Sequence, residues 1–237
     1  MSTILILGGY GATGKLLALH LLQQTDAHLI LAGRNLDKAN LYRKIYLADD
    51  PRVTCARVDA SDAASLAASL RGVDLCLVAA PTTQFTGQVA RACLDAGTDY
   101  LDVQFAASKL AALRALEPEI LKSGRCFVTE AGYHPGLPAA LVRYAATYFD
   151  SLESAIVAGY LNVGDLPYTE AVDELVEAFK DYDARVYKNG AWTKRGGYET
   201  RKFDFGTRIG QKYCFSMFFE EMGDLPKMFP SLKETGF

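Results

Sequence analysis

The sequence contains no long uninterrupted apolar segment, and its first apolar run, residues 4–7, stops at Gly8. A membrane-spanning helix needs roughly 18 or more consecutive apolar residues, so we expect no membrane span and no membrane partner. The short run also has no basic segment before it, which argues against a secretory signal peptide.

An excess of charge of one sign is also absent. The 25 Lys and Arg residues are set against 28 Asp and Glu residues, which leaves a net charge of −3. Nucleic acids and anionic membrane surfaces attract strongly basic proteins, so neither is an expected partner.

Cysteine is scarce, with five residues among 237. The number is odd, no pair has C-x-x-C spacing, and no Cys/His cluster has the spacing of metal ligands, so we expect no structural zinc. Widely spaced cysteines within apolar segments are typical of reduced, buried thiols, and they predict a cytoplasmic protein.

A glycine-rich turn at residues 8–14 separates the apolar run from an apolar-periodic segment at residues 15–22. Strand, turn and helix in this order are the context of the dinucleotide-binding fingerprint, in which the pyrophosphate lies on the helix N-terminus. Two spacings fit, G-x-G-x-x-G from position 9 and G-x-x-G-x-x-G from position 8, and the second resembles extended short-chain dehydrogenases and their nucleotide-sensing relatives. A purely structural turn is the alternative. The predicted cofactor-binding residues of this turn are Gly8, Gly9, Tyr10, Gly11, Ala12, Thr13 and Gly14.

The end of the second predicted strand, residues 28–32, indicates which dinucleotide binds. NAD-binding domains carry an acidic residue here for the ribose 2′-hydroxyl, whereas this chain has Arg34 and no carboxylate before Asp37. A guanidinium suits a 2′-phosphate, so NADP is favoured over NAD. Asn35 adds a second predicted cofactor residue and can cap the next helix. An exposed arginine near a helix start is the alternative reading of Arg34.

Two later strand ends complete the predicted cofactor site. The strand at residues 53–58 ends at Asp59, which either contacts the adenine or forms a turn and helix cap. The strand at residues 73–79 ends at Ala80 and Pro81, at the switch point of the sheet, where we expect the nicotinamide ribose.

Six such strands alternate with helices over residues 1–150, which predicts a doubly wound parallel α/β sheet, a Rossmann domain. Pro118 lies inside the helix predicted over residues 108–122 and is expected to kink or split it. Residues 151–237 predict a partial second α+β domain with a mainly antiparallel sheet. Its expected elements are strands at 154–163, 184–187, 198–205 and 211–219, and a helix at 168–180.

Several segments, in their order and spacing, together resemble the saccharopine dehydrogenase-like family. They are the glycine-rich turn, residues 32–34, the strand that ends at Asp59, and residues 78–81, 90–102 and 132–138. The resemblance implies an NADP-binding Rossmann domain and a second domain that carries substrate specificity and the contact of a homodimer. It also implies reductases that join amines and carbonyl compounds through an imine, alongside members of unassigned activity. Relatives generally continue beyond residue 237, so we expect a shortened second domain.

Catalytic candidates lie after the fifth and sixth strands. His134 is the first choice as acid/base, because it titrates near neutrality in a Gly/Pro-rich loop, although a packing or capping role is the alternative. Asp102 and Tyr133 are further candidates. The basic residues at positions 194, 195, 201, 202 and 208 either recognise an anionic substrate or form a solvated hairpin face.

These patterns predict an NADP-dependent oxidoreductase that reduces a C=N or C=O bond of a small metabolite, or runs the reverse reaction. A catalytically silent NADP-binding module that senses or regulates is the alternative. A short-chain reductase is disfavoured, because the Tyr-x-x-x-Lys match, Tyr198 to Lys202, falls in a predicted strand far downstream.

Overall fold

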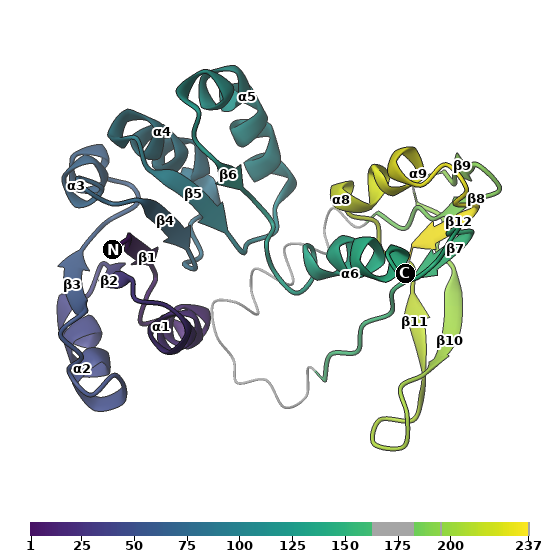
Figure 1. Ribbon diagram of the computed structural model, residues 1–237, viewed down its shortest axis with the longest axis horizontal. Coiled ribbons are helices and arrows are strands. Elements are labelled where there is room, and N and C mark those ends of the chain that lie inside the picture. Colours follow the sequence, from purple (N-terminus) through teal and green to yellow (C-terminus); the bar gives the residue numbers. More distant parts are fainter. Residues whose placement is uncertain (163–182, 195, 237) are drawn as a thin grey trace. The chain divides into compact units, whose positions relative to one another are not determined.

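The computed structural model describes residues 1–162, 183–194 and 196–236, and the chain divides into two compact units (Figure 1). The first unit is Met1–Ala131 and the second is Gly132–Phe237. The division comes before helix α6 (Leu137–Ala146), whereas the boundary expected from the sequence, at residue 150, comes after it.

The first unit is built on a six-stranded parallel sheet with the order β3-β2-β1-β4-β5-β6. This is the doubly wound order of dinucleotide-binding domains and confirms the predicted Rossmann sheet. The central strands read as apolar runs because helices cover both of their faces. The strands are β1 (Thr3–Leu7), β2 (His28–Gly33), β3 (Val53–Arg57), β4 (Leu75–Val78), β5 (Asp99–Asp102) and β6 (Phe127–Val128).

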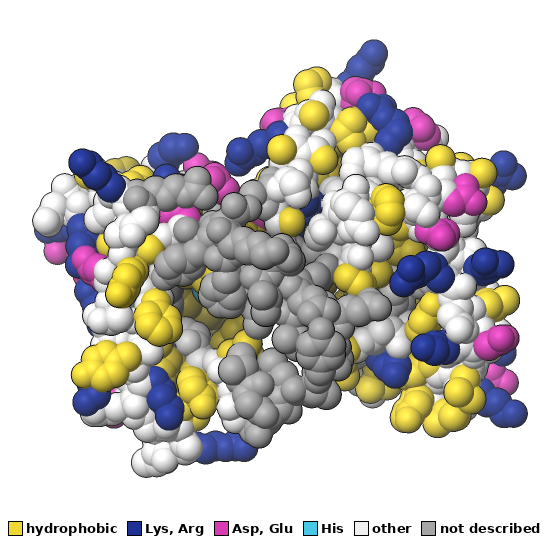
Figure 2. Space-filling model, turned by 180° about the vertical axis from the view of Figure 1, so that it is seen from behind, with side chains coloured by type: hydrophobic (Ala, Val, Ile, Leu, Met, Phe, Trp, Pro, Cys, Tyr) yellow, Lys and Arg dark blue, Asp and Glu magenta, His cyan; other side chains and the backbone are white. Residues whose placement is uncertain are grey.

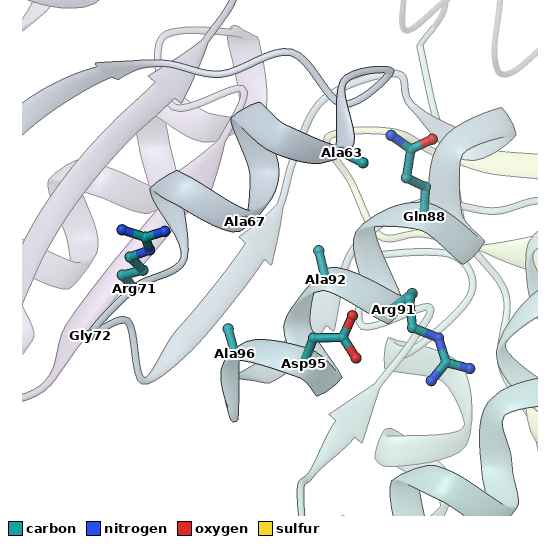
Figure 3. A pocket seen from close by; sticks show the side chains of 9 residues that line it. All are labelled: Ala63, Ala67, Arg71, Gly72, Gln88, Arg91, Ala92, Asp95 and Ala96. Atoms are coloured by element: carbon teal, nitrogen blue, oxygen red, sulfur yellow. The ribbon is translucent and has the colours of Figure 1, made fainter.

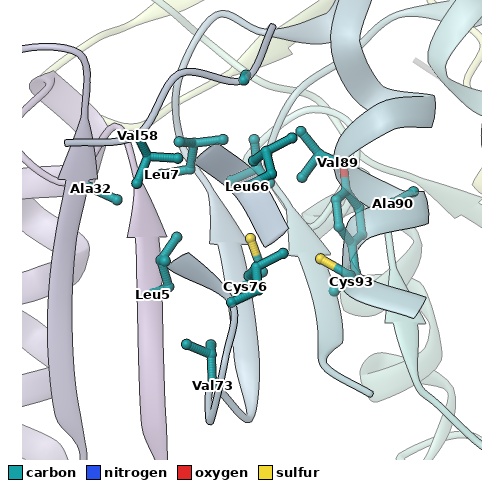
Figure 4. Packing of buried hydrophobic residues seen from close by; sticks show 14 of the residues in the cluster. Leu5, Leu7, Ala32, Val58, Leu66, Val73, Cys76, Val89, Ala90 and Cys93 are labelled. Carbon is teal, nitrogen blue, oxygen red and sulfur yellow. The ribbon is translucent and has the colours of Figure 1, made fainter. Parts of the chain in front are cut away.

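Helices α1 and α2 cover one face of this sheet, and α3, α4 and α5 cover the other (Figure 1). Each face has its own buried cluster, and Figure 4 shows the one in which Cys76 of β4 packs near Cys93 of α4. The helices are α1 (Ala12–Gln24), α2 (Leu36–Tyr46), α3 (Ala63–Ser69), α4 (Thr86–Ala96) and α5 (Ala107–Ser123), with a short 3₁₀ helix η1 (Thr83–Phe85) before α4.

Local sequence signals set the ends of these helices. Asn35 caps α2 by accepting a hydrogen bond from the Lys38 amide at 2.9 Å, and Asp62 caps α3 in the same manner. Gly97 and Gly124 end α4 and α5 in the left-handed conformation that favours glycine. Of the two effects expected at Pro118, the split does not occur, since α5 continues through this residue as one helix, and the kink stays a prediction.

The second unit contains two small sheets. Strands β7 (Ser154–Ile156), β12 (Glu234–Gly236), β8 (Tyr187–Lys188) and β9 (Ala191–Trp192) form a mixed sheet in which only β7 and β12 pair in parallel. Strands β10 (Thr200–Asp204) and β11 (Gln211–Phe215) form an antiparallel hairpin. The helices described here are α6 (Leu137–Ala146), α8 (Glu220–Gly223) and α9 (Leu225–Met228).

These elements confirm a second α+β region but correct several boundaries. The strand expected over residues 154–163 is three residues long, and the strand expected at residues 184–187 begins only at Tyr187. Strand β12 and the two short helices α8 and α9 had no counterpart in the sequence reading. The helix expected over residues 168–180 lies outside the described residues.

Candidate cofactor-binding site

The glycine-rich turn is packed so tightly that a side chain is excluded at several of its glycines. Gly8 has φ +86°, and a Cβ there would lie 2.8 Å from the Ala80 Cβ. A Cβ on Gly14 would lie 2.1 Å from the Gly8 carbonyl oxygen, which also accepts a hydrogen bond from the Gly11 amide at 2.8 Å. Gly8, Gly11 and Gly14 therefore converge on one carbonyl, and the spacing that begins at Gly8 describes this turn. Gly9 is also constrained, since its Cβ would lie 3.0 Å from the Leu31 Cα.

Helix α1 begins directly after this turn with its first amides open. Its N-cap is Gly11, which offers no side-chain cap, and the first turn contains no acidic residue. The Lys15 amide is the first to bond back, to the Gly11 carbonyl at 3.0 Å. The amides of Ala12, Thr13 and Gly14 thus have no hydrogen-bond partner among the described residues, an arrangement that suits the pyrophosphate of a dinucleotide.

Tyr10 connects the glycine-rich turn to the loop after β2. Its hydroxyl accepts a hydrogen bond from the Asn35 amide at 2.8 Å. A Cβ on Gly33 would lie 2.6 Å from the same hydroxyl oxygen, so the tyrosine ring needs a glycine beneath it. This contact fixes the backbone that presents Arg34. The Asn35 side chain is used in capping α2, and its contact with a cofactor stays a prediction.

Arg34 and Asp59 follow neighbouring strands of the sheet. Arg34 is exposed and makes no hydrogen bond or ion pair in the part of the chain that the structure describes. The Asp59 carboxylate accepts hydrogen bonds from the Ser61 amide at 2.9 Å and the Ser61 hydroxyl at 2.7 Å. These bonds, and then the charges of Arg34 and Arg57, lower the pKa of Asp59. Asp59 therefore forms the expected turn, whereas Asp62 is the helix cap; the adenine contact of Asp59 stays a prediction.

The end of β4 lies against the glycine-rich turn, as the close approach of Ala80 to Gly8 shows. The Ala80 carbonyl accepts hydrogen bonds from the Thr82 amide at 2.8 Å and from the Gln104 side-chain amide. This segment, with Pro81, is thereby held from β4 and from the loop after β5. The position expected for the nicotinamide ribose is bounded by backbone and small side chains.

Asp102 is completely buried at the end of β5. Its carboxylate accepts a hydrogen bond from Lys109 Nζ at 2.5 Å, and both side chains have 0% exposure. The hydroxyls of Tyr100 and Thr129 donate to the other carboxylate oxygen at 2.7 and 2.9 Å. Backbone amides of Gln104 and Glu130 donate as well. Burial, and then the charge of Asp102, raise the pKa of Tyr100.

The sequence reading did not identify Lys109. The only signal available was a lysine seven positions after an aspartate that ends a strand, and a lysine in a helix usually faces solvent. The structure gives Asp102 the surroundings of a fixed, compensated anion, so the acid/base role predicted for it has no support from this geometry.

His134 and Tyr133 belong to the second unit. The His134 ring packs edge-on against Phe219 with 4.3 Å between ring centroids, while part of the imidazole is exposed. Crowding by neighbouring atoms removes water from the ring and lowers the pKa of His134. Tyr133 is 60% exposed, 6.3 Å from His134 between ring centroids. The adjacent Gly136 amide donates to Glu221 at 2.9 Å, which holds the loop. Their catalytic roles stay predictions.

The basic residues expected near residues 194–208 do not form one free cluster. Arg201 pairs with Glu234 at 2.5 Å, and Lys202 lies over the Tyr213 ring. Arg195 is outside the described residues. In Figure 2, acidic and basic side chains are interspersed over the described part of the visible face.

A groove of about 610 Å³ lies between α3 and α4 (Figure 3). Alanines from both helices line it, with Arg71 at one end and Arg91 toward the other. None of the predicted cofactor or catalytic residues lines it. Among the described residues, no group of three or more His, Cys, Asp and Glu side chains could hold a metal, and no helix is long and apolar enough to cross a membrane.

Comparison with known families decides what this site binds. The family of saccharopine dehydrogenase NADP-binding domains matches residues 4–128, which include the glycine-rich turn, Arg34 and Asp59. The chain belongs to this family. Its cofactor is NADP, as Arg34 predicted, and the family resemblance seen in the sequence is confirmed.

A solved structure shares the fold. The apo saccharopine dehydrogenase (L-Glu forming) of Saccharomyces cerevisiae is 18% identical, with a TM-score of 0.71, over 100% of this chain and 54% of that one. This chain therefore spans about half the length of that enzyme. A Citrobacter sp. triphenylmethane reductase complexed with NADP(H) is 20% identical, with a TM-score of 0.43, over 65% of this chain and 57% of that one. The similarity to the reductase is too weak to support any further conclusion.

Proposed function

We propose that this chain is an NADP-dependent oxidoreductase of the saccharopine dehydrogenase-like type, which transfers a hydride to or from a C=N or C=O bond of a small metabolite. The observation that supports it most is the phosphate-binding cradle of the first unit, which consists of the glycine-rich turn, the N-terminus of α1 and the loop with Arg34. There the tightly packed turn and the uncapped N-terminus of α1 are connected, through the hydroxyl of Tyr10, to the loop that carries Arg34.

Each part of this cradle has a proposed role. The amides of Ala12, Thr13 and Gly14 hold the pyrophosphate, and Arg34 pairs with the 2′-phosphate through its planar donor fork. Asp59 faces the adenine, and the backbone at Ala80 and Pro81 borders the nicotinamide ribose. When bound, NADPH supplies the hydride, while the protein orients the reactants and manages the proton.

His134 is the proposed proton donor or acceptor. Support comes from its place in the Gly/Pro-rich loop after β6 and from the exposure of part of its imidazole, and the lowered pKa favours the neutral ring, which can accept a proton. The adjacent Tyr133 hydroxyl is a second proton-carrying group in the same loop. Asp102 is not in the proposed catalytic set, because its carboxylate is buried and already accepts five hydrogen bonds.

A regulatory NADP-binding module is the second candidate, and one observation favours it. In the described part of the first unit, Asp102 at the end of β5 is paired with Lys109 and has no exposed side-chain surface. Such a unit would bind the nucleotide without contributing an acid or base of its own.

The first test is cofactor selectivity. One charge-assisted contact contributes roughly 1.5–3 kcal/mol, so Arg34→Ala should weaken NADPH binding by roughly 10- to 100-fold and leave NADH binding almost unchanged. Calorimetric titration of the wild-type chain and the variant with both nucleotides measures this. Arg34→Lys keeps the charge but loses the fork, and it should give an intermediate loss. Equal losses for NADPH and NADH would contradict the assignment of Arg34.

The second test is turnover. NADPH oxidation is followed in the presence of pairs of amino acids and 2-oxo acids or aldehydes, which form imines in solution, and in the presence of the carbonyl compounds alone. Oxidation that requires both partners supports reduction of a C=N bond, and oxidation with the carbonyl compound alone supports reduction of C=O. Tight NADPH binding without turnover of any pair would favour the regulatory module.

A further inference from the structure

A second arginine lies at the end of the strand next to the one that Arg34 follows. Arg57 is the last residue of β3, the outer strand of the parallel sheet (Figure 1). Gly33 and Arg57 are partners in the register of β2 and β3, and the Val58 amide donates to the Gly33 carbonyl at 3.0 Å. Arg57 therefore lies in the neighbouring strand at the level of the residue that precedes Arg34.

Both guanidinium groups are exposed, and neither has a hydrogen bond or an ion pair within residues 1–162, 183–194 and 196–236. Two other arginines of the first unit, in contrast, pair with carboxylates of the protein. Arg52 pairs with Asp50 at 3.0 Å, and Arg91 pairs with Glu119 at 2.5 Å. The donors of Arg34 and Arg57 thus remain available to a ligand.

Asp59, the carboxylate closest in sequence to Arg57, forms no ion pair with either arginine among the described residues. One carboxylate oxygen of Asp59 accepts hydrogen bonds from the Ser61 amide and hydroxyl. The charges of Arg34 and Arg57 both help to lower the pKa of Asp59, so both act on the same small region. Residues 34–38 and 57–59 together carry three cations and two carboxylates, a net charge of +1 on a chain whose net charge is −3.

Two guanidinium groups at neighbouring strand ends repel each other unless an anion lies between them or beside them. A phosphate monoester suits this arrangement, because it carries up to two negative charges and can accept paired hydrogen bonds from arginine. The 2′-phosphate is the group by which NADP differs from NAD, and the end of β2 is where such domains hold this part of the ribose.

We propose that Arg57 is a second 2′-phosphate-binding residue, which acts with Arg34 to set the preference of this chain for NADP over NAD. The proposal rests on the placement of the cofactor in the proposed function, in which Arg34 contacts the 2′-phosphate. It adds a residue from a different strand, 23 positions further along the chain.

The experiment separates recognition of the phosphate from catalysis by using half of the cofactor. Adenosine 2′,5′-bisphosphate and adenosine 5′-monophosphate are titrated by calorimetry into the full chain and into Arg34→Ala, Arg57→Ala and the double variant. Arg71→Ala is the matched control, because Arg71 is also exposed and its loss changes the net charge equally, but Arg71 lies in the turn between α3 and β4. NADPH and NADH are then titrated in the same way.

Arg57→Ala should weaken binding of the bisphosphate and of NADPH by roughly 5- to 20-fold, with less than twofold change for the monophosphate and NADH. The double variant should bind NADPH no more tightly than NADH. Because both side chains are exposed, folding should be unaffected, and thermal unfolding of each variant checks this.

The proposal is overturned if Arg57→Ala behaves as Arg71→Ala does, or if it weakens the bisphosphate and the monophosphate equally. If Arg34→Ala lowers selectivity and Arg57→Ala does not, only this inference fails. If Arg34→Ala itself leaves selectivity unchanged, the cofactor placement in the proposed function fails, and this inference fails with it.

Discussion

The two units of the chain differ in how their secondary structure is supported. In the first unit, helices cover both faces of the parallel sheet, and strands such as β1 and β4 are almost entirely buried. In the second unit, the hairpin of β10 and β11 carries aromatic side chains that remain exposed, with Tyr213 at 69% and Phe215 at 65%. Similar local interactions therefore occur in a buried setting in one unit and in a solvated setting in the other.

The contribution of an interaction to stability depends on how far it is buried. An ion pair joins Lys109 to Asp102 at 0% exposure in the first unit, and another joins Lys188 to Glu199 at 34% and 39% exposure in the second. Glycines differ in the same manner. A Cβ added at Gly14 would meet backbone atoms, whereas a Cβ added at Gly190 would meet no heavy atom of the described residues within 4 Å, apart from its chain neighbours. Substitutions at these matched positions test how far burial determines the contribution of each interaction.

The largest effect is expected from Lys109→Met. This change leaves the Asp102 carboxylate buried without its cation, which should lower the free energy of unfolding by about 3–5 kcal/mol. Lys188→Met removes a partly exposed pair and should cost only about 0.2–1 kcal/mol, because water solvates the remaining carboxylate. Equilibrium unfolding in urea of both variants measures the two losses.

A second substitution tests the cause of that loss. Adding Asp102→Asn to Lys109→Met removes the uncompensated charge and should restore part of the lost stability, since the amide oxygen can still accept hydrogen bonds from Tyr100 or Thr129. Losses of similar size for Lys109→Met and Lys188→Met would show that burial does not distinguish the two ion pairs.

Gly14→Ala should have the next largest effect. The added Cβ meets the Gly8 carbonyl oxygen at 2.1 Å, so the turn must shift, at a cost of roughly 2–3 kcal/mol. The shift displaces the first amides of α1, and NADPH binding should be lost. Gly190→Ala places alanine at φ +84° in open space and should cost about 1–2 kcal/mol with NADPH binding retained.

Thermal unfolding and calorimetric titration with NADPH distinguish these outcomes. A Gly14→Ala chain that still bound NADPH with wild-type affinity would mean that the tight turn is not needed for the cofactor. Equal stability losses at Gly14 and Gly190 would mean that backbone conformation, rather than steric enclosure, limits both positions.

The two units also differ in how far the sequence predicts them. Most strands and helices of the first unit follow from local signals, such as Asn35 and Asp62 as N-caps and Gly97 and Gly124 as stops. In the second unit, β12 pairs with β7, where Glu234 lies opposite Ser154. Strands of two or three residues joined across such a distance leave no local periodicity, so the sequence predicted β7 only approximately and did not predict β12.

The residues of the candidate site also differ in how far the sequence predicts them. The glycine-rich turn and Arg34 have the spacing of a known dinucleotide-binding pattern, so their roles could be predicted, and family membership confirms NADP as the cofactor. The choice between the two glycine spacings required the contact of Gly14 with the Gly8 carbonyl. The sequence did not identify Lys109 as the partner of Asp102, because its burial depends on how α5 packs on the sheet. It did not identify Arg57 as a neighbour of the Arg34 loop, because this depends on the pairing of β2 with β3.

The smallest expected effect concerns His134 in the second unit. Its pKa in the folded chain is lower than the usual value of about 6.5, because crowding disfavours the charged ring. Between these two pKa values the unfolded chain binds more protons than the folded chain, so stability rises with pH there. As the pH falls below about 6.5, wild-type stability should therefore fall relative to that of His134→Gln, and above it the difference should be constant.

Urea unfolding across this pH range measures the effect, and NMR titration of the imidazole gives its pKa directly. Phe219→Leu is the informative companion, because it removes the ring that packs edge-on against His134 and should move the pKa back toward its usual value. A pH profile shared by the wild type and His134→Gln would show that the second unit leaves this ring as hydrated as in the unfolded chain. The neutral imidazole at physiological pH would then follow from the ordinary chemistry of histidine and require no contribution from the fold.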